Sequence, residues 1–300
     1  MTKVFEGVFP AITTPFSADG SVDHGFLREH ARWMMDAGCA GMVPLGSLGE
    51  GNTLEHAEKL SVLETLVDAL GTAPVVPGIA SLSTHGAVQL ARDVQAAGCQ
   101  GLMVLPPYVY SSDWREMKAH VGAVIAATEL PVLLYNNPLA YRTDFLPHQM
   151  VELAAEHPNL RGVKESSADV RRVTALRALL PERVELLVGV DDALVEGVAA
   201  GATGWVAGLV NAFPAESVEL YELSRAGRHE EARRLYEWFL PLLRIDTVTK
   251  FVQLIKLVQQ EVGHGSARVR APRLELSPDE RAVALATLQE ALDRRPAAVG

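Results

Sequence analysis

A lysine ends one of the apolar stretches of this sequence, and its place there suggests covalent chemistry. Residues 159–169 read NLRGVKESSAD, so Lys164 is followed at once by Glu165. The stretch lies between a helical pattern that ends at Pro158 and another that begins after Ser167, which predicts a buried strand. Because an isolated buried ammonium is costly, such a lysine is paired with a carboxylate, loses its proton, or lies at the mouth of a cavity where it reacts.

The elements that would position this lysine are indicated by a repeated junction. AGCAGMV at 37–43, AGCQGLMV at 97–104 and AGATGWV at 200–206 each close a helical pattern at Ala-Gly and open an apolar, strand-like segment at a second glycine. Two further strand patterns begin after proline, and three more are apolar runs. The sequence therefore predicts eight strands, within the stretches 7–16, 37–43, 73–80, 97–104, 130–138, 159–166, 183–192 and 200–206.

Strand and helix patterns alternate along the chain, which predicts an α/β fold with a parallel sheet covered by helices. Eight such units predict closure into a (β/α)8 barrel, the TIM barrel, over residues 1–213. A doubly wound open sheet is the alternative. It is the weaker one, because the chain around the first turn reads ITTPFSADGS and carries no glycine fingerprint for a dinucleotide.

From residue 214 onward the patterns are helical only, which predicts a C-terminal helical extension over residues 214–300. The helical patterns are AESVELYELSRAG, RHEEARRLYEWFLPLLRIDTV, TKFVQLIKLVQQEVG and SPDERAVALATLQEALDRR. We expect the extension to pack on the barrel. Its leucine, tryptophan and phenylalanine side chains would serve equally well as a subunit contact.

Composition excludes several classes of protein. Of the 300 residues 48% are hydrophobic and 21% are charged, which is typical of a globular chain with a large core. The net charge of -10 offers no basic surface for nucleic acid. Cys39 and Cys99 match no metal-binding spacing, and we expect no metal and no cofactor. Without a signal-peptide core or a run of about 18 apolar residues, we expect a cytoplasmic protein that does not enter a membrane.

In such a barrel, function belongs to the loops at the carboxyl ends of the strands. These ends bring together one amine, two phenols and a glycine-rich turn, as expected for a small substrate that carries a carboxylate. Lys164 is the only basic residue among them, and an amine in a shielded pocket can attack a carbonyl to form a Schiff base. Tyr135 is placed to move the proton. The other candidates are Ser47 as a catalytic residue and Gly46, Leu48, Gly189 and Val206 as substrate-binding residues.

Acidic residues at the same ends have simpler interpretations. Glu50 stands just before a predicted helix, where a carboxylate favours the helix N-terminus. Asp191 and Asp192 are most simply the N-cap of the helix that follows them.

Four motifs resemble the dihydrodipicolinate synthase / N-acetylneuraminate lyase superfamily. They are GSLGEG at 46–51, YNNP at 135–138, GVKESS at 162–167 and GVDDALVEGVAAGATGWVAGLVNAFP at 189–214. The resemblance covers nearly the whole chain and implies a (β/α)8 barrel, usually a homotetramer. It further implies that Lys164 forms the Schiff base with a 2-oxo acid, that Tyr135 is the acid/base residue, and that Ser47 with the adjoining amides holds the carboxylate.

Departures from the synthase of that superfamily bear on the substrate. Leu48 stands where the synthase has a second threonine, and Val109 stands at the matching position of a relay tyrosine. Ala140 replaces the arginine that binds the carboxylate of the aldehyde substrate, and Arg142 is shifted by two residues. The resemblance therefore predicts that two members of the hydroxyl relay are missing.

The segments YNNPLAYRTDF, KESSADVRRVTAL, GVDDALVEGV and WVAGLVNAFPAE are more similar to the branch that contains 1-pyrroline-4-hydroxy-2-carboxylate deaminase. The expected reaction is deamination of this cyclic imino acid to 2-oxoglutarate semialdehyde. The alternatives are 4-hydroxy-tetrahydrodipicolinate synthase, a pyruvate-dependent aldolase and a 2-keto-3-deoxy sugar acid dehydratase. A non-enzymatic sensor of 2-oxo acids is a further alternative, although a binder needs neither a nucleophile nor a relay phenol.

Overall fold

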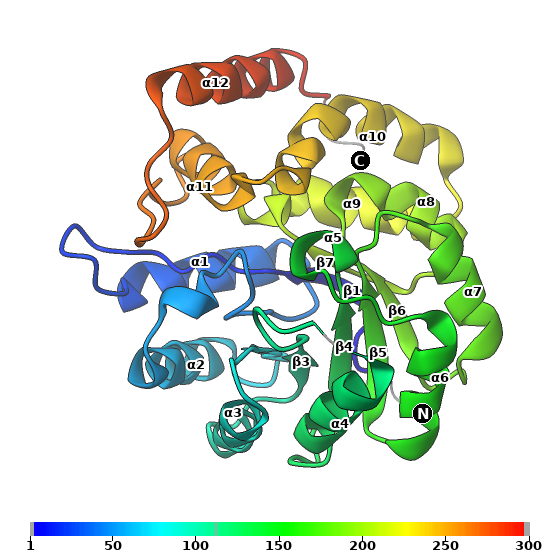
Figure 1. Cartoon of the computed structure of the whole chain (residues 1–300). Helices are drawn as coiled ribbons and strands as arrows, with labels where there is room; N and C mark the ends of the chain where they lie inside the picture. Colours follow the sequence, from blue (N-terminus) through cyan, green and yellow to red (C-terminus); the bar gives the residue numbers. More distant parts are fainter. Residues whose placement is uncertain (1–2, 112, 297–300) are drawn as a thin grey trace.

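The computed structural model describes residues 3–111 and 113–296 and contains one curled parallel sheet at its centre (Figure 1). The strand order is β1-β7-β6-β5-β4-β3-β2, and every neighbouring pair is parallel. The strands are β1 (Gly7–Pro10), β2 (Gly78–Ile79), β3 (Leu102–Val104), β4 (Val132–Asn136), β5 (Leu160–Glu165), β6 (Glu185–Val188) and β7 (Gly204–Ala207). The predicted α/β barrel architecture is confirmed, and it contains seven regular strands among the described residues.

The predicted strand within residues 37–43 is a single bridge rather than a ladder. Met42 pairs in parallel with Val75, and the N–H of Val43 donates to the carbonyl of Pro10 at 2.8 Å. This segment therefore closes the barrel between β1 and the residues before β2. Proline has no N–H to donate, and Pro74 and Pro77 interrupt the ladder on the neighbouring segment, which accounts for the irregular pairing.

Helices cover the outside of the sheet (Figure 1). Side-chain N-caps fix where several begin: Asp23, Ser83 and Asp113 accept from the N–H groups of Phe26, Gly86 and Glu116. The helices are α1 (His24–Asp36), α2 (His56–Leu70), α3 (Thr84–Ala96), α4 (Trp114–Ile125), α5 (Pro138–Tyr141), α6 (Pro147–Glu156), α7 (Arg171–Leu179), α8 (Leu194–Ala199) and α9 (Pro214–Arg225). Short 3-10 turns are η1 (Gly51–Thr53), η2 (Asp191–Ala193) and η3 (Leu209–Asn211). None of the described helices is long and apolar enough to cross a membrane.

The interior of the barrel is packed with side chains, so it is not a channel. Phe5 is fully buried among the inward-facing residues. A Cβ at Gly162 would lie only 2.8 Å from the Phe5 ring, so a glycine is needed on β5 beneath Lys164. The interior cluster is Phe5, Phe9, Val43, Val76, Met103, Leu105, Leu133, Tyr135, Leu187 and Val206. Four of its members, Val43, Met103, Tyr135 and Val206, line the cavity described below.

The C-terminal part of the chain is helical, as the sequence predicts, and α10, α11 and α12 lie together on one side of the barrel (Figure 1). These elements are α10 (His229–Leu243), η4 (Arg244–Thr247), α11 (Phe251–Glu261) and α12 (Pro278–Asp293). Helix α9 contacts β1 and α8, and α10 packs on α9. The division of the chain at residue 213 stays a prediction, and residues 297–300 of the predicted extension lie outside the described residues.

Candidate active site

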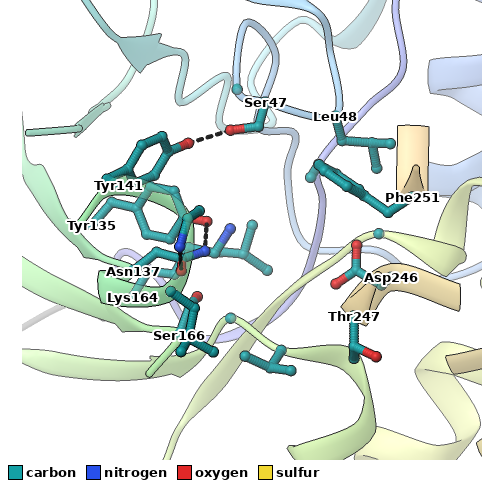
Figure 2. A pocket seen from close by; sticks show the side chains of 18 of the residues that line it. Ser47, Leu48, Tyr135, Asn137, Tyr141, Lys164, Ser166, Asp246, Thr247 and Phe251 are labelled. Atoms are coloured by element: carbon teal, nitrogen blue, oxygen red, sulfur yellow. Dashed lines mark hydrogen bonds between the residues drawn. The ribbon is translucent and has the colours of Figure 1, made fainter. Parts of the chain in front are cut away.

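A cavity of about 670 Å³ opens at the carboxyl ends of the strands. It is lined by all seven residues that the sequence singles out: Gly46, Ser47, Leu48, Tyr135, Lys164, Gly189 and Val206. Figure 2 shows the tyrosines and Lys164 on one side of it and the segment from Asp246 to Phe251 on the other. Among the described residues, no cluster of three or more His, Cys, Asp or Glu side chains is placed to hold a metal ion.

Lys164 lies near the end of β5 and is 6% exposed. Its register partner on β4 is Tyr135, and its Nζ lies 4.1 Å from the centre of the Tyr135 ring. Within the described part of the chain no carboxylate forms an ion pair with Lys164, and the neighbouring Glu165 instead accepts hydrogen bonds from Asn136 and Ser167. The lysine therefore stands at a cavity rather than in a buried salt bridge.

Gly189 leaves the space that the lysine side chain occupies. A Cβ at this position would lie 2.7 Å from Lys164 Cε and 1.9 Å from Ser166 Oγ. The distances rule out any side chain here unless the lysine moves. Gly189 thus makes room for the side chains of Lys164 and Ser166. Its role in binding the substrate stays a prediction.

Tyr135 presents its hydroxyl to the cavity from within the barrel. The side-chain amide of Asn137 donates to the Tyr135 hydroxyl oxygen at 2.9 Å. The same Asn137 caps the short helix α5, because its Oδ1 accepts from the N–H of Ala140 at 3.0 Å. One residue of the YNNP motif therefore orients both the phenol and the turn that follows it.

Two further phenols line the cavity: Tyr108, which with Tyr135 makes the two phenols expected at the strand ends, and Tyr141, which the sequence analysis did not place there. Tyr141 shares a short hydrogen bond with the Ser47 hydroxyl, and the Tyr108 ring centre lies 5.8 Å from that of Tyr141. Burial raises the pKa of the Tyr108 and Tyr141 hydroxyls, so both keep their protons at neutral pH. Val109 is 98% exposed, whereas Tyr108 beside it lines the cavity, and the loss of a relay phenol at Val109 stays a prediction.

The cavity has a second basic residue, whereas the sequence analysis expected Lys164 alone. Arg142 is exposed and lies outside the lining, while Ala140 and Leu48 line the cavity as expected. Arg273 also lines it, although it lies far from any strand end in sequence. Lys164 is therefore not the only basic group at the cavity, because the C-terminal segment brings in a second one.

Asp191 is not an N-cap, so that interpretation was wrong. Its fully buried carboxylate accepts from Trp205 Nε1 at 3.1 Å and from the N–H groups of Gly208 and Leu209. Burial raises its pKa to about 6 despite these donors. Asp192 faces the cavity and lies 3.5 Å from Arg244. Asp191 thus fastens the end of β7 to η2 beneath the site.

Glu50 anchors the glycine turn rather than a helix N-terminus, which corrects the second acidic interpretation. It is fully buried and lies at a positive φ of 52°. Its carboxylate accepts from Lys256 Nζ at 2.7 Å and from the N–H of Arg270 at 3.0 Å. Lys256 also donates to the carbonyl of Arg268 at 2.6 Å. The C-terminal segment therefore holds the turn that carries Ser47.

We expect Lys256→Met to destabilise the fold by about 3–5 kcal/mol, because it leaves the Glu50 carboxylate buried without its main partner. Methionine retains the packing on Phe16, whose ring centre lies 4.5 Å from Nζ. Urea denaturation measures the change. The control is Lys250→Met, which removes an exposed ion pair with Glu280 and should cost less than about 1 kcal/mol. Equal costs for the two variants would contradict the anchoring role.

Residues 4–291 match the dihydrodipicolinate synthetase family. Over 281 residues, covering 93% of this chain and 92% of the relative, the sequence is 32% identical to the 4-hydroxy-tetrahydrodipicolinate synthase of Haloarcula marismortui. A crystal structure of dihydrodipicolinate synthase superposes with a TM-score of 0.91 at 28% identity and covers 95% of this chain and 99% of that one. YagE, a prophage protein of the same family from E. coli K12 solved with pyruvate, gives 0.91 at 26% identity over 96% of this chain and 99% of that one.

The parallel α/β barrel with Lys164 lining a cavity at the carboxyl ends of its strands fits the class of α/β-barrel lyases. The chain belongs to the dihydrodipicolinate synthase family. It is an enzyme of this family, whose lyases use a lysine Schiff base.

Proposed function

We propose that Lys164 attacks carbon 2 of a 2-oxo acid or cyclic imino acid and that Tyr135 moves the protons. The observation that carries this proposal is the place of Lys164, which lines the cavity without an ion pair and has its Nζ 4.1 Å from the Tyr135 ring centre. An amine so placed can form an imine, and the protonated imine withdraws electrons from the adjacent carbon. The Tyr135 hydroxyl is held by Asn137, and Tyr135 is the register partner of Lys164 on the neighbouring strand, which suits it to proton transfer.

The glycine turn is proposed to hold the carboxylate of the substrate. Ser47 and Leu48 line the cavity, and the N–H groups of both donate no hydrogen bond to the described part of the protein. Backbone N–H groups in such a turn make a good anion site. The Ser47 hydroxyl is hydrogen-bonded to that of Tyr141, and the Tyr108 ring centre lies 5.8 Å from that of Tyr141.

The reaction proposed for this site is deamination of 1-pyrroline-4-hydroxy-2-carboxylate. The substrate already has a C=N bond at carbon 2, so Lys164 can add there and open the ring by exchanging one imine for another. Loss of the hydroxyl from carbon 4 as water leaves a C3=C4 bond, and transfer of one proton from carbon 5 and one from its nitrogen to carbon 3 and carbon 4 turns the C5 amine into a C5=N imine. Addition of water to this imine and to the Lys164 imine then frees ammonia and 2-oxoglutarate semialdehyde. This reaction needs no arginine at Ala140 for a second carboxylate and no hydroxyl at Leu48, and both residues line the cavity.

The second candidate is 4-hydroxy-tetrahydrodipicolinate synthase, and two observations favour it. The relatives with this name, at 32% and 34% identity, support it more directly than they support the deaminase. Tyr108 and Tyr141 also bring hydroxyls to a cavity in which the deaminase argument took a phenol and a threonine hydroxyl to be missing. Arg273, which lies 3.6 Å from Glu50, also lines the cavity and offers a guanidinium group to a second carboxylate. The choice between the two candidates therefore depends on a direct comparison of substrates.

We expect purified protein to release ammonia from 1-pyrroline-4-hydroxy-2-carboxylate with a kcat/KM at least about tenfold above that for condensing pyruvate with aspartate semialdehyde. Coupled assays for the semialdehyde and for the condensation product measure the two values. A faster condensation would replace the deaminase by the synthase. If neither reaction runs, dehydration of a 2-keto-3-deoxy sugar acid is assayed next. Pyruvate binding without any turnover would then indicate a sensor.

The assembly and location of the enzyme stay inferences from the resemblance. We infer a homotetramer, because the superfamily is usually tetrameric and the side chains of Val109, Tyr110 and Leu139 are exposed. The location in the cytoplasm is inferred from the sequence alone. A molar mass in solution near the 32.4 kDa of one chain would contradict the tetramer.

A further inference from the structure

One acidic residue reaches the cavity from outside the barrel. Asp246 lies in η4, between α10 and α11, and lines the same cavity as Lys164. Figure 2 shows its carboxyl group across the cavity from Tyr135 and Tyr141. The strand ends that a barrel sequence points to do not include this residue, and the reaction outlined above does not yet use it.

The fold makes specific room for this carboxyl group. A Cβ at Gly208 would lie 2.5 Å from Asp246 Oδ1 and 3.0 Å from its Cγ, so any larger residue at the end of β7 would displace the acid. The η4 turn is fixed from both sides: it contacts α10, α11 and η2, and the Thr247 hydroxyl donates to the Arg244 carbonyl at 2.9 Å. Asp246 is thus held in place by the loop that carries it.

Asp246 differs from its two acidic neighbours in its partners: its carboxyl group accepts from the backbone N–H of Asp191. Asp191 is satisfied by three donor groups, and Asp192 lies beside Arg244. Asp246, by contrast, forms no ion pair with any described residue. Burial and the nearby Asp191 raise its pKa well above the usual range, against the opposing effect of Lys164. A pKa raised in this way favours the protonated carboxyl group, which is the form that a general acid requires.

We propose that Asp246 is the general acid that protonates the hydroxyl group leaving carbon 4 of the substrate bound to Lys164. The inference rests on the proposed deaminase function and names the substrate class more closely: 2-oxo or imino acids with a hydroxyl on the second carbon from the reacting one. Tyr135 and Asp246 lie on opposite sides of the cavity (Figure 2), so one can serve carbon 3 while the other serves the oxygen on carbon 4.

The step balances without an oxidant or a reductant. The proton on carbon 3 leaves by way of Tyr135, and the electron pair of the C–H bond forms the C2=C3 bond of the enamine. The enamine nitrogen then re-forms the C2=N bond, a C3=C4 bond forms, and the C4–O bond breaks with its electron pair on oxygen. That oxygen takes the Asp246 proton and leaves as water. Asp246 remains as a carboxylate and regains its proton from solvent before the next turnover.

Asp246→Asn tests the proposal because it keeps the shape of the side chain and removes the acid. We expect ammonia release from 1-pyrroline-4-hydroxy-2-carboxylate to fall about 10²- to 10⁴-fold. Borohydride trapping of pyruvate on Lys164 and exchange of the carbon 3 hydrogens with D₂O, followed by NMR, should stay near the wild-type level. Asp246→Glu should recover part of the lost rate, since it restores the acid at a changed distance.

Each other outcome overturns the proposal in a distinct way. Ammonia release within about threefold of wild type would show that no acid is needed at this position. Loss of trapping and exchange together with turnover would show that Asp246 positions Lys164 instead. If the wild-type enzyme itself releases no ammonia, the proposed function fails first and this inference fails with it.

Discussion

Replacing Lys164 by alanine should reduce turnover on the order of 10⁶-fold, the scale expected when a covalent nucleophile is removed. The lysine forms no ion pair with any described residue, so its removal leaves no buried charge without a partner. The variant should therefore fold, and circular dichroism and thermal unfolding should match the parent protein. Lys250→Ala, at an exposed site on the C-terminal segment, is the control and should retain full activity.

A Lys164→Ala variant that keeps more than about a tenth of the parent rate would contradict the assignment, because no covalent intermediate could then pass through this residue. A variant that fails to fold would instead indicate that the lysine is structural. Activity and unfolding are therefore to be measured on the same preparation.

Tyr135→Phe should lower kcat by about 10²- to 10⁴-fold, the usual range for general acid–base catalysis. Phenylalanine keeps the ring that lies 4.1 Å from Lys164 Nζ and that meets the Tyr141 ring edge-on at 5.7 Å. Only the hydroxyl that accepts from Asn137 is lost. Steady-state kinetics measure the effect.

The matched control is Tyr110→Phe, which removes a phenol that is half exposed and donates to Glu116. It should leave kcat unchanged. An equally unchanged kcat in Tyr135→Phe would show that Tyr135 is a packing residue of the barrel interior and that the protons move by another route.

The features of this fold that depend on local pattern could be read from the sequence. Helix and strand alternate with clear periodicity, and Ala-Gly junctions mark where helices end, so the barrel was predictable. The carboxyl ends of parallel strands must meet at one edge, and for that reason Lys164, Tyr135 and Ser47 line one cavity, as expected. The irregular pairing beside Pro74 and Pro77 was not predicted, although prolines that cannot donate to a ladder account for it.

The features that depend on tertiary packing could not be read in this way. Asp246 and Arg273 reach the cavity only because the C-terminal segment folds back over the barrel mouth. Glu50 and Asp191 look like helix caps in sequence, yet both are buried. Each accepts hydrogen bonds from another segment of the chain, Glu50 from Lys256 and Asp191 from Gly208. Which of two adjacent residues, Tyr108 or Val109, points inward was likewise decided by the loop conformation.

The central claim is that Lys164 forms the Schiff base, and one measurement tests it most directly. The protein is incubated with pyruvate, reduced with borohydride, digested and analysed by mass spectrometry, because reduction fixes an imine as a stable secondary amine. We predict a reduced pyruvyl group on Lys164 and on no other lysine. An adduct on a different lysine, or no adduct at saturating pyruvate, would contradict the account.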